Sequence, residues 1–419
     1  MHKVVFTATI FGLLCSLFVT MLASGSEVDL TVAMWIAAGP EVDRTQEILD
    51  TYMAENKGVN LELTYQSFSG YHEKMLTLAA GGLTPDVMVL SRIFLPTFVE
   101  NGIIQPIDQW LARDGINPQR DLTEIASGSW AGRIYGVPIW GGPLVLTYNA
   151  DMFSEMGLPQ PSELSRRNDW TWDRFIDVGK KITRDTDGDG IKDVFALPAA
   201  GYWEAVWYTY IRAFGGDVIR NGRSVADSAE TARGLQLFAD VRWQHHISPQ
   251  PGESADFFKG KIAANYTWMS EAPNRYNTVG GAFTIDLVTM PSGPAGLFHT
   301  AGGCPVTVSA TTSHPEEAYK LATWFAVDSD EWKLRGIPAS MSITRRQYRD
   351  YLAQFFASPD VVIEALSGQI APEPSVHPRI TQLQAAWTPI INSLAAGTMS
   401  GVEAAAQMGR STAVILGAN

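Results

Sequence analysis

The chain contains very little cysteine. Among its 419 residues only Cys15 and Cys304 occur, and Cys15 lies within an apolar N-terminal stretch. The chain beyond that stretch holds a single thiol, so it cannot form an intramolecular disulfide. A small secreted domain stabilised by disulfides is therefore excluded, and a bacterial periplasmic protein fits better. Cys304 has no adjacent histidine, and a lone cysteine is more often a small buried packing residue than a nucleophile.

Positive charge is also scarce. The sequence has 31 Lys and Arg against 44 Asp and Glu, a net charge of -13, and no Lys/Arg cluster longer than a pair. A nucleic-acid-binding protein needs a basic face to neutralise phosphates. We therefore expect no nucleic-acid partner.

Long apolar runs are absent beyond the first residues, so the body of the chain has no predicted membrane span. The N-terminus is basic at His2 and Lys3, apolar and uncharged over 4–20, and rich in small residues over 23–26. This pattern is typical of an export signal. We predict that residues 1–25 are a signal peptide and that the mature protein is periplasmic.

Two alternatives for the N-terminus stay open. The apolar run could extend to Leu22 and act as an uncleaved anchor, since about 20 apolar residues can span a bilayer. Cys15 could instead carry a lipid. The residue before it, Leu14, is bulky where a lipidation site requires a small residue, so lipid anchoring at Cys15 is not favoured.

Recognisable catalytic motifs are missing. The sequence contains no GxSxG, HExxH, phosphate-binding loop or dinucleotide fingerprint. His245 and His246 are adjacent, so on a helix they would point in different directions and would not chelate one metal. A glycosidase needs two opposed carboxylates, and no pattern pairs any of the acids. We therefore predict a protein that is not an enzyme, with a secreted glycan-active enzyme as the remaining enzymatic alternative.

Aromatic residues, by contrast, are abundant. The chain has 13 Trp and 13 Tyr, while only 18% of its residues are charged. The roughly 390 residues after the signal are too many for one core and predict two domains. Two cores need fewer tryptophans than this, so the surplus indicates a cleft lined by rings.

The mature chain begins with an alternation of strands and helices. Strands are predicted over 30–36, 61–65 and 86–90, with helices over 41–56 and 71–80 between them. Such spacing predicts an α/β domain with a mostly parallel sheet.

Glycine next to proline marks two possible hinges farther along. Residues 141–143 separate two extended runs, and 291–303 have the same character. Ser313, with Glu three positions later, predicts the N-cap of a helix. Helices are also expected over 380–396 and 402–416.

Short motifs in a fixed order extend over nearly the whole mature chain. They are TPDVMVLS (84–91), GRIYGVPIW (132–140), LTYNADMF (146–153), WTWDRF (170–175), DTDGDGIKD (185–193), GKIAANYTW (260–268), MPSGPAG (290–296), HPEEAYKLATWF (314–325) and GIPASMS (336–342). Each motif alone is weak, but their combination resembles the family 1 extracellular solute-binding proteins. These are the maltose-binding-protein-like sugar receptors of ABC importers.

The resemblance implies a two-lobed periplasmic-binding-protein fold of type II, the Venus-flytrap architecture. The implied division places 26–140 in lobe 1, 141–292 in lobe 2, 293–342 as a return segment in lobe 1, and 343–419 as C-terminal helices of lobe 2. A carbohydrate, either a mono- or an oligosaccharide, would bind between the lobes. The closed, loaded monomer would then be recognised by the membrane permease of an ABC transporter. A receptor of the same fold for a polyamine, a glycerol phosphate or an amino-acid-like compound remains the nearest alternative.

The aromatic candidates for ligand contact are chosen because sugar C–H faces stack on flat rings. Trp268 matches the tryptophan that commonly serves as a sugar platform in the family. Trp140 lies at the first expected crossing, Tyr202 and Trp203 lie in a loop-like stretch, and Trp35 ends the first strand. Core packing is the alternative for each ring.

The polar candidates are Glu41, Ser91, Arg92 and the backbone of Gly302 and Gly303. Arg92 follows a strand at its cleft-facing end, so its forked donors could bind sugar hydroxyls or a uronate carboxylate. An ordinary surface ion pair is its alternative. Asp86 is expected to anchor the strand instead of contacting ligand. The loop over 37–40 has few polar side chains, so the identity of the sugar does not follow from the sequence.

The stretch from 185 to 193 resembles part of a calcium loop. Asp185, Asp187, Asp189 and Asp193, with the backbone of Ile191, are candidate metal ligands, because they occupy positions 1, 3, 5, 9 and 7 of such a loop. Position 12, normally a bidentate Glu, is Ala196. The alternative is a turn formed by Asp and Gly residues. A bound Ca²⁺ would be structural, and no other cofactor is expected.

Overall fold

The computed structural model describes residues 27–36, 38–201 and 203–417, apart from the side chains of Leu334 and Arg335. The predicted signal peptide (1–25), with Cys15, and the candidate Tyr202 lie outside the described residues. In the described part, none of the helices combines the length and the apolar character that crossing a membrane requires.

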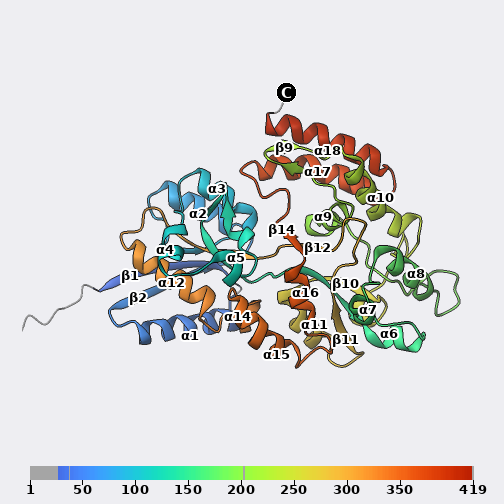
Figure 1. The fold of residues 1–419 in the computed structure, drawn as a ribbon, viewed down its shortest axis with the longest axis horizontal. Coiled ribbons are helices and arrows are strands. Elements are labelled where there is room, and N and C mark those ends of the chain that lie inside the picture. Colours follow the sequence, from blue (N-terminus) through green and yellow to red (C-terminus); the bar gives the residue numbers. More distant parts are fainter. Residues whose placement is uncertain (1–26, 37, 202, 418–419) are drawn as a thin grey trace, which may run out of the picture.

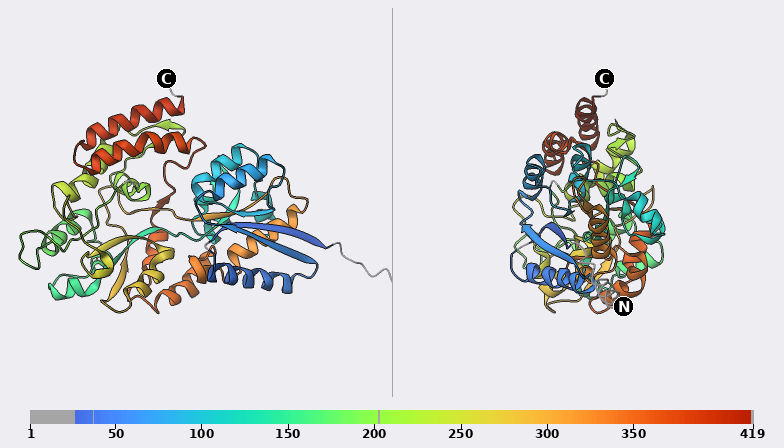
Figure 2. Two further views of the ribbon diagram at one scale, coloured as in Figure 1. Left: turned by 180° about the vertical axis from the view of Figure 1, so that it is seen from behind. Right: turned by 90° about the vertical axis from the view of Figure 1, so that its left-hand side faces the viewer.

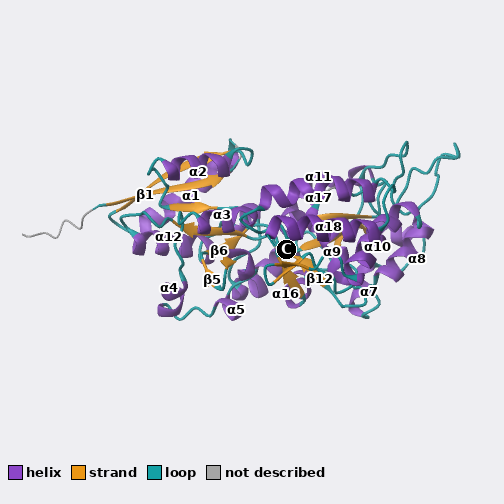
Figure 3. Cartoon of the chain, turned by 90° about the horizontal axis from the view of Figure 1, so that it is seen from above, coloured by secondary structure: helices purple, strands orange, loops and turns teal. Residues whose placement is uncertain are grey.

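The described residues fold into two lobes that lie side by side (Figure 1). Seen from behind, the blue helix near the N-terminus and the red C-terminal helices belong to different lobes (Figure 2). Figure 3 shows that both lobes contain strands and helices. The mixed α/β, two-lobed architecture predicted from the sequence is confirmed.

The first lobe is built on a sheet whose described strands have the order β2-β1-β3-β13-β6. Its strands are β1 (Val28–Trp35), β2 (Val59–Gln66), β3 (Val87–Val89), β6 (Gly136–Ile139) and β13 (Cys304–Val308). The first three strands pair in parallel as predicted, but β13 is antiparallel to both β3 and β6. β6 therefore runs in the same direction as the first three strands, so the expectation of a mostly parallel sheet is confirmed, and β13 is the one described strand that runs the opposite way.

The helices of the first lobe cover this sheet. They are α1 (Pro40–Glu55), α2 (Tyr71–Ala80), α3 (Leu95–Glu100), α4 (Asp108–Arg113), α5 (Pro118–Asp121) and α12 (Pro315–Val327), beside the hairpin β4 (Ser129–Trp130) and β5 (Arg133–Ile134). α1 buries Ile48, Leu49 and Tyr52, which recur at helical spacing and pack against the strands. α12 begins after His314 without a side-chain cap, so the predicted cap at Ser313 is wrong.

Asp86 anchors the start of β3, the central strand of this sheet, as the sequence predicts. Its carboxylate accepts hydrogen bonds from the backbone N and the hydroxyl of Thr31, each 2.8 Å long. It also accepts one from the hydroxyl of Thr312. The side chain therefore joins β1 to the segment before α12 and does not line the cleft described below.

The second lobe is built around an antiparallel sheet. Its described strands have the order β10-β7-β11 and are β7 (Leu144–Asn149), β10 (Ala264–Trp268) and β11 (Ile285–Val288). Two short pairs accompany it: β12 (Phe298–Thr300) with β14 (Gln369–Ala371), and β8 (Ile219–Arg220) with β9 (Arg223–Ser224). The helices are α6 (Ala150–Glu155), α7 (Pro161–Arg166), α8 (Trp172–Ile182), α9 (Glu204–Ala213), α10 (Ala229–Trp243), α11 (Ala272–Val279), α16 (Val361–Ser367), α17 (Ile380–Ala395) and α18 (Gly401–Leu416).

Short helices connect α12 to α16. These are α13 (Trp332–Arg335), α14 (Met341–Ile343), a π-helical turn (Thr344–Tyr348) and α15 (Arg349–Leu352). Trp332 and Ile337 pack in a core of the second lobe, whereas Ala339 packs in a core of the first. Residues 298–300, which the predicted boundary at 293 places in the first lobe, pair with β14 and lie beside α9 in the second.

The crossings between the lobes touch one another at glycines. Gly141 has a φ of 65°, and a Cβ built on it would lie 1.9 Å from the carbonyl oxygen of Gly302. A Cβ on Gly336 would lie 2.8 Å from the Cα of Trp140. Only glycine permits backbones to approach this closely. The predicted hinges at 141–143 and 291–303 therefore meet at one place between the lobes.

Candidate functional site

A cleft of about 870 Å³ lies between the lobes, and residues of both lobes and of the crossings line it. Its volume is in the range of sites that enclose small-molecule ligands, which is about 300–1,000 Å³. The candidates Trp35, Glu41, Ser91, Arg92, Trp140, Trp203, Trp268 and Gly302 are among its lining residues. Gly303 is not among the described lining residues.

Each lobe contributes a pair of tryptophans to this cleft. In the first lobe, the rings of Trp35 and Trp140 meet edge to face with centroids 5.0 Å apart. In the second lobe, the rings of Trp203 and Trp268 meet edge to face at 6.1 Å. Trp140 is only 5% exposed, and its indole N–H donates to Glu331, so its ring belongs largely to the first core. The other three rings are partly exposed to the cleft.

These rings lie at the cleft because of their positions at the ends of strands or just before a helix. Trp35 is the last residue of β1, and Trp268 is the last residue of β10, so both stand where a strand ends at the cleft. Trp203 precedes α9 in extended conformation. Phe68, which the sequence analysis did not single out, packs against Trp35 at 5.5 Å and is 50% exposed.

A buried histidine positions Ser91. The backbone N–H of Ser91 donates to Nε2 of His72 over 2.9 Å, and the imidazole stacks on Phe94 at 4.1 Å. Burial lowers the pKa of His72 to about 3, so the ring is neutral and can accept this hydrogen bond at neutral pH. His72 therefore fixes the turn that carries Ser91 and Arg92 from the end of β3 into the cleft.

Arg92 forms a buried ion pair. Its Nε donates to Oε2 of Glu373 over 2.7 Å, and its Nη2 donates to Oε1 of the same carboxylate. Its Nη1 donates to the carbonyl oxygen of Gly302 over 3.2 Å. The guanidinium also lies 5.0 Å from the ring centroid of Trp268, a cation–π distance. The pair is buried, so it is not the surface ion pair that was the alternative for Arg92.

Two further carboxyls surround this ion pair. Glu124 accepts a hydrogen bond from the backbone N–H of Gly302 over 3.0 Å, and burial raises its pKa to about 7. Glu204, in the first turn of α9, accepts one from the backbone N–H of Ser375 over 2.8 Å. Burial, together with the charge of Glu373, raises the pKa of Glu204 to about 7. The backbone of Gly302, expected to contact ligand, thus bonds to Glu124 and Arg92.

Acids outnumber cations among the described lining residues of the cleft. The acids are Glu41, Glu204, Glu271 and Glu373, and the cations are Arg92 and Lys333. Glu271 pairs with Arg275 at 3.2 Å, and Lys333 pairs with Asp330 at 2.7 Å. Both of these pairs are more exposed than the Arg92–Glu373 pair.

Sequence reasoning missed most of the lining residues that come from the C-terminal third of the chain. Among those it missed are Lys333, Tyr351, Glu373 and Gln384, and it also missed Asn274 and Asn277 of α11. The two asparagines could have been proposed from the sequence as cleft residues, because they lie three positions apart on one helix just after the motif that ends at Trp268. Glu373 follows a three-residue strand and has no pattern around it.

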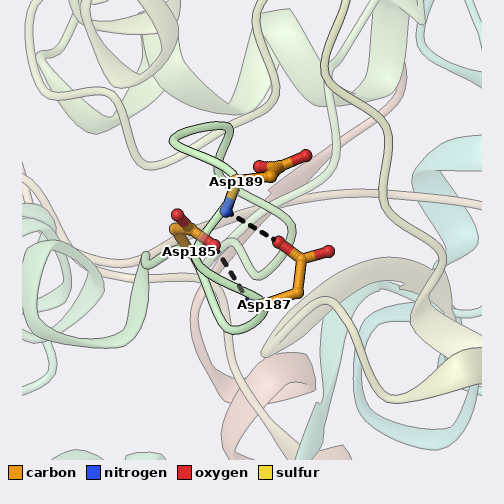
Figure 4. A group of neighbouring side chains, drawn as sticks. All are labelled: Asp185, Asp187 and Asp189. Atoms are coloured by element: carbon orange, nitrogen blue, oxygen red, sulfur yellow. Dashed lines mark hydrogen bonds between the residues drawn. The ribbon is translucent and has the colours of Figure 1, made fainter.

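The predicted calcium loop brings three of its acids together. Carboxylate oxygens of Asp185, Asp187 and Asp189 lie within 4.8 Å of one another on an exposed loop (Figure 4). Asp193 instead accepts hydrogen bonds from Lys261 and Thr186, each 2.6 Å long. The backbone N–H of Ile191 donates to Asp189 over 2.7 Å. Calcium binding stays a prediction, in which Lys261 competes for the position-9 carboxylate.

Known proteins share both the sequence pattern and the fold. The sequence model of the family "Bacterial extracellular solute-binding protein" matches residues 38–330. A Brucella abortus protein described only as a binding protein is 25% identical over 332 residues, which cover 74% of this chain and 75% of that protein.

Two solved structures have the same fold. The sugar-binding protein MalE of Xanthomonas citri has a TM-score of 0.76 and 19% identity, covering 92% of this chain and 97% of its own. An ABC substrate-binding protein of Listeria monocytogenes in complex with cycloalternan has a TM-score of 0.74 and 18% identity, covering 94% and 100%.

Proposed function

Because the chain belongs to the bacterial extracellular solute-binding proteins, we propose that it is the ligand-capturing component of an ABC importer for a carbohydrate. The observation that carries this proposal is the placement of two tryptophan pairs, one from each lobe, at a single interlobe cleft. Rings of this kind stack on the apolar faces of sugars. The fold is also that of a sugar-binding MalE and of a protein solved with the oligosaccharide cycloalternan.

In the proposed mechanism, closure of the lobes captures the ligand. A ligand that contacts Trp35 on one lobe and Trp268 on the other favours the closed form by its differential affinity. The closed, loaded monomer is then delivered in the periplasm to the permease, and the solute is released unchanged. The cleft provides aromatic surface and hydrogen-bonding groups for binding.

The test is a thermal-shift screen of the mature protein against mono-, di- and oligosaccharides, polyamines and glycerol phosphates. A ligand that binds only the folded state raises the midpoint with the logarithm of its excess over Kd. A large shift with one sugar, recovered chemically unchanged after incubation, supports the proposal. Shifts with a charged solute alone would contradict the carbohydrate assignment.

One alternative ligand class has a specific observation in its favour. Four carboxylates and two cations are among the described lining residues, so a polyamine fits the charge of the cleft better than a glycerol phosphate does. Each ammonium group of a polyamine could pair with a carboxylate. The same thermal-shift screen distinguishes a polyamine from a sugar as ligand, because a polyamine ligand would give the largest shift of the unfolding midpoint.

Replacing Trp268 by alanine (W268A) tests the sugar platform. Loss of the ring should weaken binding of the identified sugar by about 1 kcal/mol or more, roughly fivefold in Kd, because the stacking surface is removed. Isothermal titration calorimetry measures the change. Trp110→Ala (W110A) is the matched control, because Trp110 is also partly exposed but packs against Tyr319 outside the cleft. Equal affinity of W268A and wild type would remove Trp268 from the site.

A further inference from the structure

The ion pair between Arg92 and Glu373 joins the two lobes inside the cleft. Arg92 follows β3 of the first lobe, and Glu373 follows β14, which pairs with β12 of the second lobe. The side chains are 9% and 7% exposed. Two donors of the guanidinium bind the two oxygens of one carboxylate, which is the bidentate geometry that makes arginine–carboxylate pairs strong.

This pairing determines which donor groups of the Arg92 guanidinium are available to a ligand. A bare arginine in a sugar-binding cleft would capture a carboxylate or phosphate through the same forked edge. In this cleft the Nε–Nη2 edge is bound to Glu373, and Nη1 is bound to the carbonyl oxygen of Gly302. What Arg92 presents to the cleft is therefore a neutralised group beside the ring of Trp268.

Glu373 is held in place from both lobes. Two residues farther on, the backbone N–H of Ser375 donates to Glu204 over 2.8 Å. The ring of His377 meets Trp130 of the first lobe edge to face at 6.0 Å. In Figure 1, the chain between β14 and α17 runs between the two lobes. Because the segment is fixed on both sides, the Glu373 carboxylate is preorganised for Arg92.

The surroundings of the pair are acidic. Glu124 and Glu204 are both buried, at 7% and 6% exposure, and each interacts electrostatically with Glu373. The buried cluster therefore contains three carboxyls and one guanidinium. A ligand carboxylate entering this cluster would lose its hydration, find the arginine fork occupied and face like charge.

We propose that Glu373 is a charge-selectivity residue of the cleft, which by neutralising Arg92 makes the site accept uncharged carbohydrates and reject carbohydrates that bear a carboxylate. This inference rests on the proposed carbohydrate-binding function and goes beyond it by naming the excluded class. It also replaces the expectation that Arg92 binds a uronate through its fork.

The test uses Glu373→Gln (E373Q), which keeps the shape of the side chain and removes its charge. The probes are maltose, cellobiose and galactobiose, each beside the same disaccharide oxidised to a uronate at one C6. Wild type should bind the neutral disaccharides and should not bind the uronates. E373Q frees Arg92, so its affinity for the matching uronate should rise roughly tenfold or more. Wild-type binding of a uronate as tight as that of its neutral counterpart would overturn the proposal.

Glu316→Gln (E316Q) is the matched control. Glu316 also accepts two hydrogen bonds from an arginine, Arg113, but on the exposed face of the first lobe outside the cleft. E316Q should bind every probe as wild type does. A gain of uronate affinity in E316Q equal to that in E373Q would show a non-specific charge effect and would also overturn the proposal.

A second arm needs no sugar ligand. Unfolding of wild type, Arg92→Met (R92M), E373Q and the double variant forms a double-mutant cycle, and non-additive stability losses are expected for a buried pair. Additive losses would show that the pair is absent in solution.

Acetate then serves as a bare carboxylate probe and should stabilise E373Q more than wild type. Failure of every sugar would sink the proposed function, while the cycle and acetate still decide the role of Glu373.

Discussion

Glu204 is a buried carboxyl whose ionisation should make stability depend on pH. Burial, with a contribution from the charge of Glu373, raises its pKa from 4.5 to about 7. The folded protein thus holds this proton more tightly than the unfolded chain does. The resulting stabilisation is fully present below about pH 4.5 and is lost as the pH rises through about 7.

Glu204→Gln (E204Q) removes this pH dependence, because an amide cannot ionise but can still accept the hydrogen bond from Ser375. Between pH 5 and pH 8, wild type should lose stability relative to E204Q by on the order of 1–3 kcal/mol. Urea unfolding at the two pH values measures this. The control is E316Q, since Arg113 holds the pKa of Glu316 below its usual value, so this carboxyl does not make wild type lose stability as the pH rises. A constant difference between wild type and E204Q would refute the raised pKa.

Among individual site residues, those at strand ends could be predicted from the sequence. Trp35 and Trp268 end strands that the sequence pattern located, and both line the cleft. Glu373 could not be found in this way, because its role depends on Arg92, 281 positions away in the chain. Long-range pairs of single side chains leave no periodic signal in one sequence.

Elements with strong periodicity were predicted closely. The helix expected over 41–56 is α1 (Pro40–Glu55), and the helix expected over 380–396 is α17 (Ile380–Ala395), since each repeats apolar residues at helical spacing. The direction of β13 could not be predicted, because it depends on the chain crossing to the second lobe and back. The predicted cap at Ser313 failed because His314 directly precedes α12.

Ca²⁺ binding by the loop from 185 to 193 can be tested by thermal unfolding. If its clustered carboxylates bind Ca²⁺, millimolar Ca²⁺ should raise the Tm and EDTA should reverse the shift, since a site lacking the position-12 ligand resembles weak sites with Kd of about 10⁻⁴–10⁻³ M. Lys261→Met (K261M) should enlarge the shift, because Asp193 is then released from its ion pair. Thermal unfolding with and without Ca²⁺ measures both effects.

Asp187→Asn (D187N) is the control for this loop, because it removes one charged ligand and should reduce the Ca²⁺ shift. The loop residues are not among those lining the cleft, so sugar affinity should be the same with Ca²⁺ and with EDTA. Equal Tm values with Ca²⁺ and EDTA, in wild type and in K261M alike, would identify the loop as a plain Asp/Gly turn.

The molecule as a whole consists of two lobes connected through crossings that meet at one place. Gly141 and Gly302 are in backbone contact there, and Gly336 approaches Trp140. Away from this region, the contacts that join the lobes include the Arg92–Glu373 ion pair and the Trp130–His377 ring contact. Rotation about the crossings would separate these contacts while each core stays intact. The ion pair is therefore expected to bias the ligand-free protein towards the closed form.

Small-angle X-ray scattering tests this bias in solution. Ligand-free E373Q should have a larger radius of gyration than ligand-free wild type, because loss of the interlobe pair favours open conformations. A saturating sugar should reduce the radius of both proteins to the same value, since ligand contacts with the two tryptophan pairs then hold the lobes together. E316Q should scatter as wild type does at every ligand concentration. Identical radii for ligand-free wild type and E373Q would show that the ion pair does not hold the lobes together.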